Sequence, residues 1–308
     1  MADRSVHGDL CLAVDIGGTK LAIGLVDASG AVAWQDRIRT PPATDPDALF
    51  RVVADLVEIA AGAAATMGTV VTCGVGCGGP MSPDGEAVSP LNIPAWRGFP
   101  LRDRLSQVLA RHETTRGVTD RLRIDNDAKA LALGEGWLGA AKGERNYLAM
   151  VVSTGIGGGI VVDGRLLDGD TGNAGHIGHL IVEPEGRICR CGARGCLEAE
   201  ASGTGIAAAT GAPAAEAPPE VIERTGRLVG RAVGSVANLL DLKLAVVGGS
   251  VALGYGMKFF LAAQREVDKV ARLEHSRGCR LEPVGLGELA PLIGAAAVGW
   301  GGSVQRAP

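Results

Sequence analysis

The stretch LCLAVDIGGTKLAIGLV (residues 10–26) decides the fold. Two apolar runs flank the turn residues 15–20, a pattern typical of two buried β-strands joined by a tight turn. Residues 147–162, YLAMVVSTGIGGGIVV, repeat this pattern of strand, glycine-rich turn and strand. Two copies of one unit in a single chain predict two similar α/β lobes with a cleft between them.

The composition fits an α/β protein. The chain has 308 residues, of which 46% are hydrophobic, 3% are aromatic and 47 are glycine, so the core is built from aliphatic side chains. Glycine at about twice its usual frequency suits many tight turns between strands and helices. High apolar content rules out intrinsic disorder. The net charge of −4, without a basic block, argues against nucleic acid as the partner.

The chain shows no pattern of export or membrane insertion. Its first ten residues lack the apolar core of a secretion signal. The one long uncharged run, residues 59–83, contains Pro80 and changes character midway, which argues against a membrane span. Seven cysteines are an odd number and do not form a disulfide framework. We therefore expect a soluble, cytoplasmic protein.

Hydrophobic periodicity and cap residues predict further elements. We expect a helix over 45–65 with Asp45 or Thr44 as its cap, and a helix near 128–138 directly after a strand. An Ala-rich helix near 291–299 is expected to cross back onto the first lobe. Further predicted elements are strands over 31–39, 69–76, 121–125 and 244–247 and a helix over 220–240. The expected domains are residues 1–125 completed by about 293–308, and residues 126–292.

Three glycine-rich turns follow predicted strands, namely DIGGTK (15–20), STGIGGG (153–159) and GGS (248–250). Such turns let backbone N–H groups approach phosphate oxygens without a side-chain clash. Each alone is typical of an ordinary turn, but three at strand ends favour nucleotide binding. The chain has no Walker A loop, and no dinucleotide fingerprint follows the first strand, so a P-loop NTPase and a Rossmann dehydrogenase are disfavoured.

These turns, together with IDNDAKA (124–130), GHIGH (175–179) and CRCGARGCLE (189–198), resemble the ROK sugar kinases. The resemblance runs from about Leu10 to Gly299. It implies the two-lobed, ribonuclease H-like fold of the hexokinase–actin group. It also implies ATP with Mg²⁺ as cofactor and transfer of the γ-phosphoryl group to the 6-hydroxyl of a sugar. We further expect a homo-oligomer, either a dimer or a tetramer.

One imidazole and three thiols are clustered at His179, Cys189, Cys191 and Cys196. Three thiolates and one imidazole are a ligand set of closed, tetrahedral zinc sites. A redox cluster or three buried thiols are the alternatives. In the resembled family these four positions are the zinc ligands. We therefore expect a structural zinc ion that braces the sugar-binding loop and does not activate water.

Asp127 follows a predicted strand, where a lone Asp is most often a helix cap. The resemblance instead implies that Asp127 is the general base for the sugar 6-hydroxyl. It further implies that sugar hydroxyls are bound by Gly79, Asn92, Asn126, His176, His179 and Glu198. The implied nucleotide-binding residues are Asp15, Gly17, Gly18, Thr19, Lys20, Thr154, Gly155, Gly157, Gly248 and Gly249, with Asp15 facing the Mg²⁺–phosphate group.

His176 departs from the family pattern, which usually has Glu at this position. A carboxylate accepts several hydrogen bonds, whereas a neutral imidazole offers one donor and one acceptor. The GHIGH variant, ASGTGIAAAT (201–210) and VVGGSVALG (246–254) resemble the bacterial N-acetylmannosamine kinases. The expected substrate is a 2-acetamido hexose such as N-acetylmannosamine, with glucose and an amino sugar such as kanosamine as alternatives. A different reading makes His176 only a helper of the zinc site.

The resembled family also contains sugar-sensing repressors that bind DNA. Their helix-turn-helix precedes the first strand and needs at least three helices. Because only nine residues precede Leu10 here and the net charge is negative, we expect an enzyme. A catalytically inactive sugar-binding module is also disfavoured, because Asp127 and all three glycine-rich turns are present.

Overall fold

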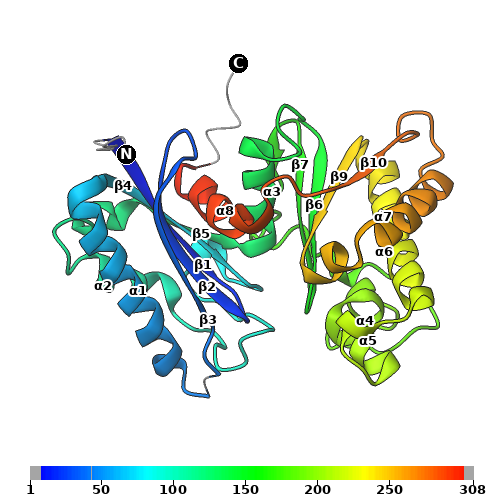
Figure 1. Ribbon diagram of the computed structural model, residues 1–308, viewed down its shortest axis with the longest axis horizontal. Helices are drawn as coiled ribbons and strands as arrows, with labels where there is room; N and C mark the ends of the chain where they lie inside the picture. The colour runs from blue at the N-terminus through cyan, green and yellow to red at the C-terminus, as the bar shows by residue number, and fades with distance from the viewer. Residues whose placement is uncertain (1–7, 43, 302–308) are drawn as a thin grey trace. The chain divides into compact units, whose positions relative to one another are not determined.

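The computed structural model describes residues 8–42 and 44–301, which form two compact units (Figure 1). Unit 1 contains the described residues up to Leu138, together with Asp168–Asn173 and the described residues from Leu286 onward. Unit 2 contains Gly139–Leu167 and Ala174–Gly285. We expected a division after residue 125, but α3 (Asp127–Leu138) lies in unit 1 because it packs against α8 (Ala290–Gly299). Residues 302–308, which we had assigned to the first lobe, lie outside the described residues.

Unit 1 is built on a sheet with the strand order β3-β2-β1-β4-β5. Its strands are β1 (Gly8–Ile16), β2 (Lys20–Asp27), β3 (Val32–Arg39), β4 (Gly68–Cys77) and β5 (Leu122–Asn126). The first three strands are antiparallel, and β4 and β5 run parallel to β1. The predicted hairpin is confirmed, since β1 and β2 are joined by the turn Gly17–Thr19.

Helices cover both faces of this sheet (Figure 1). On one face lie α1 (Pro46–Met67) and α2 (Leu101–Leu109), and on the other lie α3 and α8. The predicted cap of α1 is confirmed, because the Asp45 carboxylate accepts a hydrogen bond from the backbone N–H of Asp47 at 3.0 Å. The helix α8 approaches the sheet so closely that a Cβ on Gly74 would clash with the Ala295 carbonyl.

Unit 2 repeats the sheet of unit 1, with the strand order β10-β9-β6-β7-β8. Its strands are β6 (Tyr147–Val152), β7 (Ile156–Val162), β8 (Arg165–Leu166), β9 (Leu244–Gly248) and β10 (Arg280–Pro283). In both units a hairpin flanks the first strand on one side and two parallel strands flank it on the other. The predicted internal repeat is therefore confirmed. The predicted turn over 153–159 is shorter than we expected, because Gly157–Gly159 pair with β6 as part of β7.

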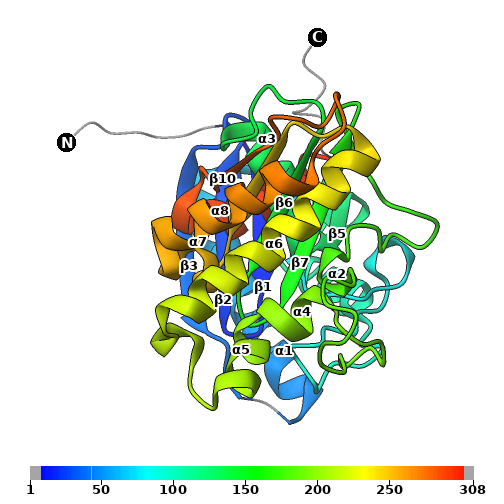
Figure 2. The same cartoon turned by 90° about the vertical axis from the view of Figure 1, so that its right-hand side faces the viewer.

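Two long helices, α6 (Pro219–Leu240) and α7 (Ser250–Val270), lie side by side across the unit 2 sheet (Figure 2). Glycines spaced four residues apart on α6 permit this contact. A Cβ at Gly226 would lie 2.6 Å from the Phe259 carbonyl oxygen, and one at Gly230 would lie 2.2 Å from that of Ala263. Two short helices, α4 (Leu197–Ala201) and α5 (Gly203–Thr210), precede α6.

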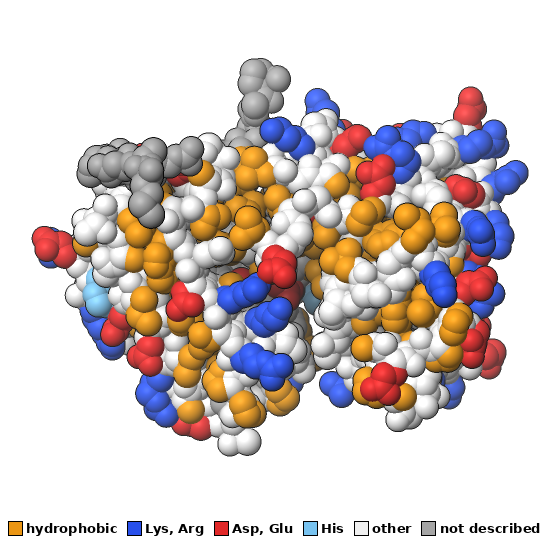
Figure 3. Space-filling model, in the orientation of Figure 1, with side chains coloured by type: hydrophobic (Ala, Val, Ile, Leu, Met, Phe, Trp, Pro, Cys, Tyr) orange, Lys and Arg blue, Asp and Glu red, His pale blue; other side chains and the backbone are white. Residues whose placement is uncertain are grey.

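The surface mixes apolar and charged side chains. On the face shown in Figure 3, hydrophobic side chains lie among acidic and basic ones in both units. The helix α7 contributes the exposed Leu253, Met257 and Leu261. Among the described helices, none combines the length and the apolar character needed to cross a membrane.

Candidate functional site

In unit 1 the carboxylate of Asp15 lies beside the start of α3. Asp15, at the end of β1, pairs in register with Gly76 of β4, which in turn pairs with Asp125 of β5. A Cβ on Gly76 would lie 3.3 Å from Asp15 Oδ1 and 3.8 Å from the Cα of Asp127. Asp15 and the first residue of α3 therefore border the same small space, at the carboxyl ends of three parallel strands. In α/β sheets this edge is where ligands bind.

Burial makes both carboxylates easier to protonate than a carboxylate in water. Loss of hydration raises the pKa of Asp15 to about 8, and the nearby charge of Asp127 adds to the effect. Burial also raises the pKa of Asp127, although the N–H of Ala128 donates to its Oδ1 at 2.8 Å and opposes that shift. Mg²⁺ favours carboxylate oxygens, so this pair of carboxylates has the donor chemistry of a magnesium site.

We expect Asp15 to make the ligand-free protein less stable as the pH rises. Its folded-state pKa lies above the ordinary value near 3.9, so its contribution to stability is present in full below about pH 4. That contribution is lost as the pH rises toward about 8. The variant Asp15→Asn should therefore show a smaller fall in its urea midpoint between about pH 5 and pH 8. Parallel midpoint curves for the two proteins would contradict the raised pKa.

Two asparagines stand at the same edge. The Oδ1 atom of Asn126 accepts a hydrogen bond from the Ala128 N–H at 2.9 Å and so caps α3. Its amide NH₂ is therefore the group that can donate to a ligand. Asn92 is exposed and lies against Gly18, where an added Cβ would be 2.9 Å from the Cβ of Asn92. At Gly78 an added Cβ would be 3.1 Å from Asn92 Oδ1.

Backbone carbonyls of the two glycine-containing segments next to these residues accept hydrogen bonds from Leu91 and Thr40. Gly79 follows Gly78 in the chain, and its carbonyl accepts a hydrogen bond from the Leu91 N–H at 3.3 Å. The Thr40 hydroxyl donates to the Gly17 carbonyl at 2.6 Å, and the Thr40 backbone N–H donates to the Thr19 carbonyl at 3.0 Å. Thr19 and Lys20 remain exposed. The structure thus brings the predicted unit 1 residues to one region.

A buried ion pair that we did not predict adjoins this region. The Lys129 Nζ atom lies 2.8 Å from Asp125 Oδ1 and 2.6 Å from Asp168 Oδ1, and it donates to the Gly172 carbonyl at 3.2 Å. The Lys129 side chain is only 3% exposed. The separation of Asp125 and Lys129 by four residues was visible in IDNDAKA, but the role of Asp168 was not.

In unit 2 the turn between β6 and β7 meets the GGS segment. The Ser153 and Ser250 hydroxyls lie 2.9 Å apart. Gly249 has a φ of 95°, and a Cβ there would clash with the carbonyl of Val152. The predicted residues Thr154, Gly155, Gly248 and Gly249 therefore gather at the carboxyl ends of β6 and β9. Gly157, near the start of β7, pairs with Val151 of β6, the same residue that pairs with Gly248 of β9 on its other side.

The Glu198 carboxylate lies under the same turn. Its Oε2 accepts a hydrogen bond from the Ile156 N–H at 2.9 Å, and a Cβ on Gly155 would lie 2.9 Å from that oxygen. This bond holds the carboxylate in place through Oε2. His176 stands just before the short turn Ile177–His179, and the rings of His176 and His179 are 6.0 Å apart between centroids.

The predicted metal ligands come together in unit 2. The ligand atoms of His179, Cys189, Cys191 and Cys196 all lie within 4.8 Å of one another. The His179 Nδ1 atom is 3.8 Å from Cys189 Sγ, and the Sγ atoms of Cys191 and Cys196 are 3.7 Å apart. Zinc with sulfur ligands at about 2.3 Å places tetrahedral neighbours about 3.8 Å apart. Donor set and spacing therefore both fit a structural zinc ion.

The chain matches known proteins over nearly its whole length. The model of the ROK family matches residues 11–299. An N-acetylmannosamine kinase of Citrobacter koseri is 35% identical over 84% of this chain and 91% of its own. The solved ROK hexokinase of Thermus thermophilus is 32% identical, with a TM-score of 0.75 over 94% of this chain and 98% of that one. A ROK glucokinase of Streptomyces griseus, solved with glucose and AMPPNP, is 28% identical, with a TM-score of 0.77 over 93% of this chain and 98% of that one.

The fold of the chain, its repeated sheet and its similarity to known proteins all define one class of protein. This class is the sugar kinases with two sheets and an actin-like α/β fold. The chain belongs to the ROK family.

Proposed function

We propose that this chain transfers the γ-phosphoryl group of ATP to the 6-hydroxyl of a 2-acetamido hexose, with N-acetylmannosamine as the lead substrate. The observation that carries the proposal is the position of Asp127 beside Asp15 at the carboxyl ends of β1, β4 and β5. The 35% identity to an N-acetylmannosamine kinase supports the substrate.

For phosphoryl transfer the protein mainly has to align the attacking hydroxyl with the phosphate, compensate the phosphate charge and supply one base. Asp127 is that base in our proposal, since burial moves its pKa toward neutrality and so makes it a better proton acceptor. The amides of Asn126 and Asn92 hold sugar hydroxyls near it. Mg²⁺ bound with ATP neutralises the phosphate charge. The glycine-rich turns donate backbone N–H groups to the phosphates.

In unit 2 we assign Glu198, His176 and His179 to the remaining sugar hydroxyls. Glu198 accepts through Oε1, because Oε2 already accepts from Ile156. Zinc on His179 and the three cysteines would fix the loop that carries these groups. This role is structural, since all four positions of a tetrahedral ion are filled by protein ligands.

A coupled assay of ADP release over a panel of hexoses tests the proposal. We expect the highest kcat/KM for N-acetylmannosamine, with lower values for glucose and kanosamine. Absence of phosphorylation of every hexose would overturn the kinase assignment. Glucose as the best substrate would support the second candidate, a glucokinase, which the relation to the Streptomyces griseus enzyme favours.

The substitution His176→Glu should shift the preference toward glucose. A carboxylate accepts more hydrogen bonds than an imidazole, and one hydrogen bond contributes about 1 kcal/mol net, which corresponds to roughly tenfold in discrimination. The ratio of kcat/KM for glucose to that for N-acetylmannosamine should rise by about that factor. His275→Glu, which adds the same charge at an exposed site of unit 2, is the matched control. An unchanged ranking in His176→Glu would remove this position from substrate selection.

A further inference from the structure

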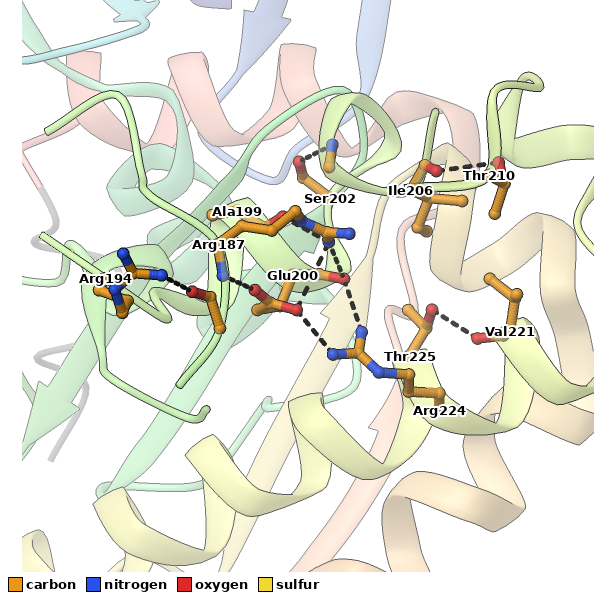
Figure 4. Close-up of polar contacts among 12 residues, drawn as sticks. Arg187, Arg194, Ala199, Glu200, Ser202, Ile206, Thr210, Val221, Arg224 and Thr225 are labelled. Atoms are coloured by element: carbon orange, nitrogen blue, oxygen red, sulfur yellow. Dashed lines mark hydrogen bonds and ion pairs between the residues drawn. The ribbon is translucent and has the colours of Figure 1, made fainter. Parts of the chain in front are cut away.

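Glu200 is a buried carboxylate that neither the metal cluster nor the sugar contacts explain. Its side chain is 3% exposed, and two guanidinium groups surround it (Figure 4). Its Oε2 atom lies 2.6 Å from Arg224 Nη2 and 3.5 Å from Arg187 Nη2, and its Oε1 accepts a hydrogen bond from the Arg187 backbone N–H at 2.6 Å. These partners outweigh the effect of burial and hold the pKa of Glu200 below its ordinary value, so it stays ionised.

The same guanidinium groups also bind the end of α4. Arg187 donates from Nε and Nη2 to the Ala199 carbonyl at 3.0 and 2.7 Å, and from Nη2 to that of Glu200 at 3.2 Å (Figure 4). Arg224 of α6 donates to the Glu200 carbonyl at 3.2 Å. Carbonyls in the last turn of a helix lack partners within the helix, and cations are favoured there.

The metal-binding loop is part of this arrangement. Arg187 stands two residues before Cys189, and its own carbonyl accepts a hydrogen bond from the Gly195 N–H at 2.8 Å. Gly186 makes the approach possible, because a Cβ there would lie 2.5 Å from Glu200 Oε1. The Arg194 guanidinium donates to the Gly186 carbonyl at 2.8 Å (Figure 4). Glu200 therefore contacts the backbone of the loop at the point where it enters the cysteine cluster.

The helix α4 cannot fix its own position. It has five residues, and isolated helices shorter than about 12 residues are not stable in water. Its first residue follows the metal ligand Cys196, and its last turn is held by Arg187 and Arg224. Glu198, the carboxylate under the β6–β7 turn, stands between these two attachments.

We propose that Glu200 is a positioning residue that joins the cysteine loop, α4 and α6, so that the zinc ligands and Glu198 are held in one geometry. Loss of its charge should loosen the loop in two ways. Zinc should leave faster, and the sugar should bind more weakly while the chemical step is less affected. The second effect rests on the proposed function, whereas the first does not.

The test compares Glu200→Gln with Glu266→Gln in the full chain. Glu266 is a second buried carboxylate of unit 2, paired with Arg231 and Lys269 and without a contact to the cysteines in the described residues. Zinc content is measured by elemental analysis, and zinc release to a chromogenic chelator is followed at 25 °C. Substitutions that disturb the partners of metal ligands cost about 10- to 100-fold in metal affinity. We expect release from Glu200→Gln to accelerate by that range, and KM for the sugar to rise more than kcat falls.

Arg224→Met provides a second variant, because Arg224 is partly exposed and Glu200 keeps its bonds to Arg187. Its zinc release should lie between those of wild type and Glu200→Gln. Equal release rates and equal KM in wild type and Glu200→Gln would overturn the proposal, even if the melting temperature fell. Wild-type protein without zinc would also overturn it. If wild-type protein retains zinc but phosphorylates no sugar, the proposed function is wrong. The comparison of zinc release rates then still tests the role of Glu200.

Discussion

Asp127→Asn should reduce turnover by about 10²- to 10⁴-fold, the range for loss of a general base. The amide has nearly the shape of the carboxylate and keeps an oxygen that can accept from the Ala128 N–H, so α3 should remain capped. What is lost is the ability to take a proton from the sugar 6-hydroxyl. Sugar binding, measured by calorimetry, should change by less than about threefold.

Asp103→Asn is the matched control for this experiment. Asp103 is an exposed carboxylate on α2 of the same unit, where it accepts a hydrogen bond from Gln107. Its turnover should equal that of wild type. Full turnover of Asp127→Asn would exclude Asp127 as the base. Loss of sugar binding in that variant would instead assign the residue to substrate recognition.

The two hairpins were predictable because their signals are local, whereas β10 was not predicted. The continuous apolar runs on either side of DIGGTK predict a hairpin of two buried strands. The second copy at 147–162 predicts a second hairpin for the same reason, and β6 and β7 form it. The cap by Asp45 was likewise predictable, since it needs only its own helix.

We predicted that the β6–β7 turn extends to residue 159, whereas β7 begins at Ile156, and the cause lies in tertiary packing. Three successive glycines have a low strand propensity, so the sequence favours a longer turn. In the fold Gly158 lies against the loop that carries His176, where an added Cβ would be 2.8 Å from Ile177 Cγ2 and 3.3 Å from the Gly175 carbonyl. The strand therefore needs a glycine at position 158, because a larger residue would clash with this loop.

The long-range ion pairs were not predictable. Lys129 and Asp168 are separated by 39 residues, and Glu200 and Arg224 by 24. Helix and strand periodicity relates only residues a few positions apart, so it cannot predict these contacts. The helix α7 was also missed, because the glycines at 254 and 256 interrupt its pattern, and its backbone departs from helical geometry at Gly256.

Lys129→Met should lower the free energy of unfolding by about 3–5 kcal/mol, the usual cost of removing one partner of a buried pair. The methionine replaces the buried chain well but leaves Asp125, which is 20% exposed, without its cation. Desolvation already raises the pKa of Asp125, and Lys129 is the charge that opposes this shift. Urea unfolding at constant pH, followed by circular dichroism, measures the change.

Two further variants separate the charge pair from simple loss of volume. Asp168 is 67% exposed, so Asp168→Asn should cost about 1 kcal/mol or less. The double variant Asp125→Asn/Lys129→Met removes both buried charges and should recover most of the lost stability, because the cost lies in the unpaired carboxylate. If the double variant is as unstable as Lys129→Met, the ammonium group acts through its packing or its bond to the Gly172 carbonyl. In that case the pairing with Asp125 is not what stabilises the start of α3.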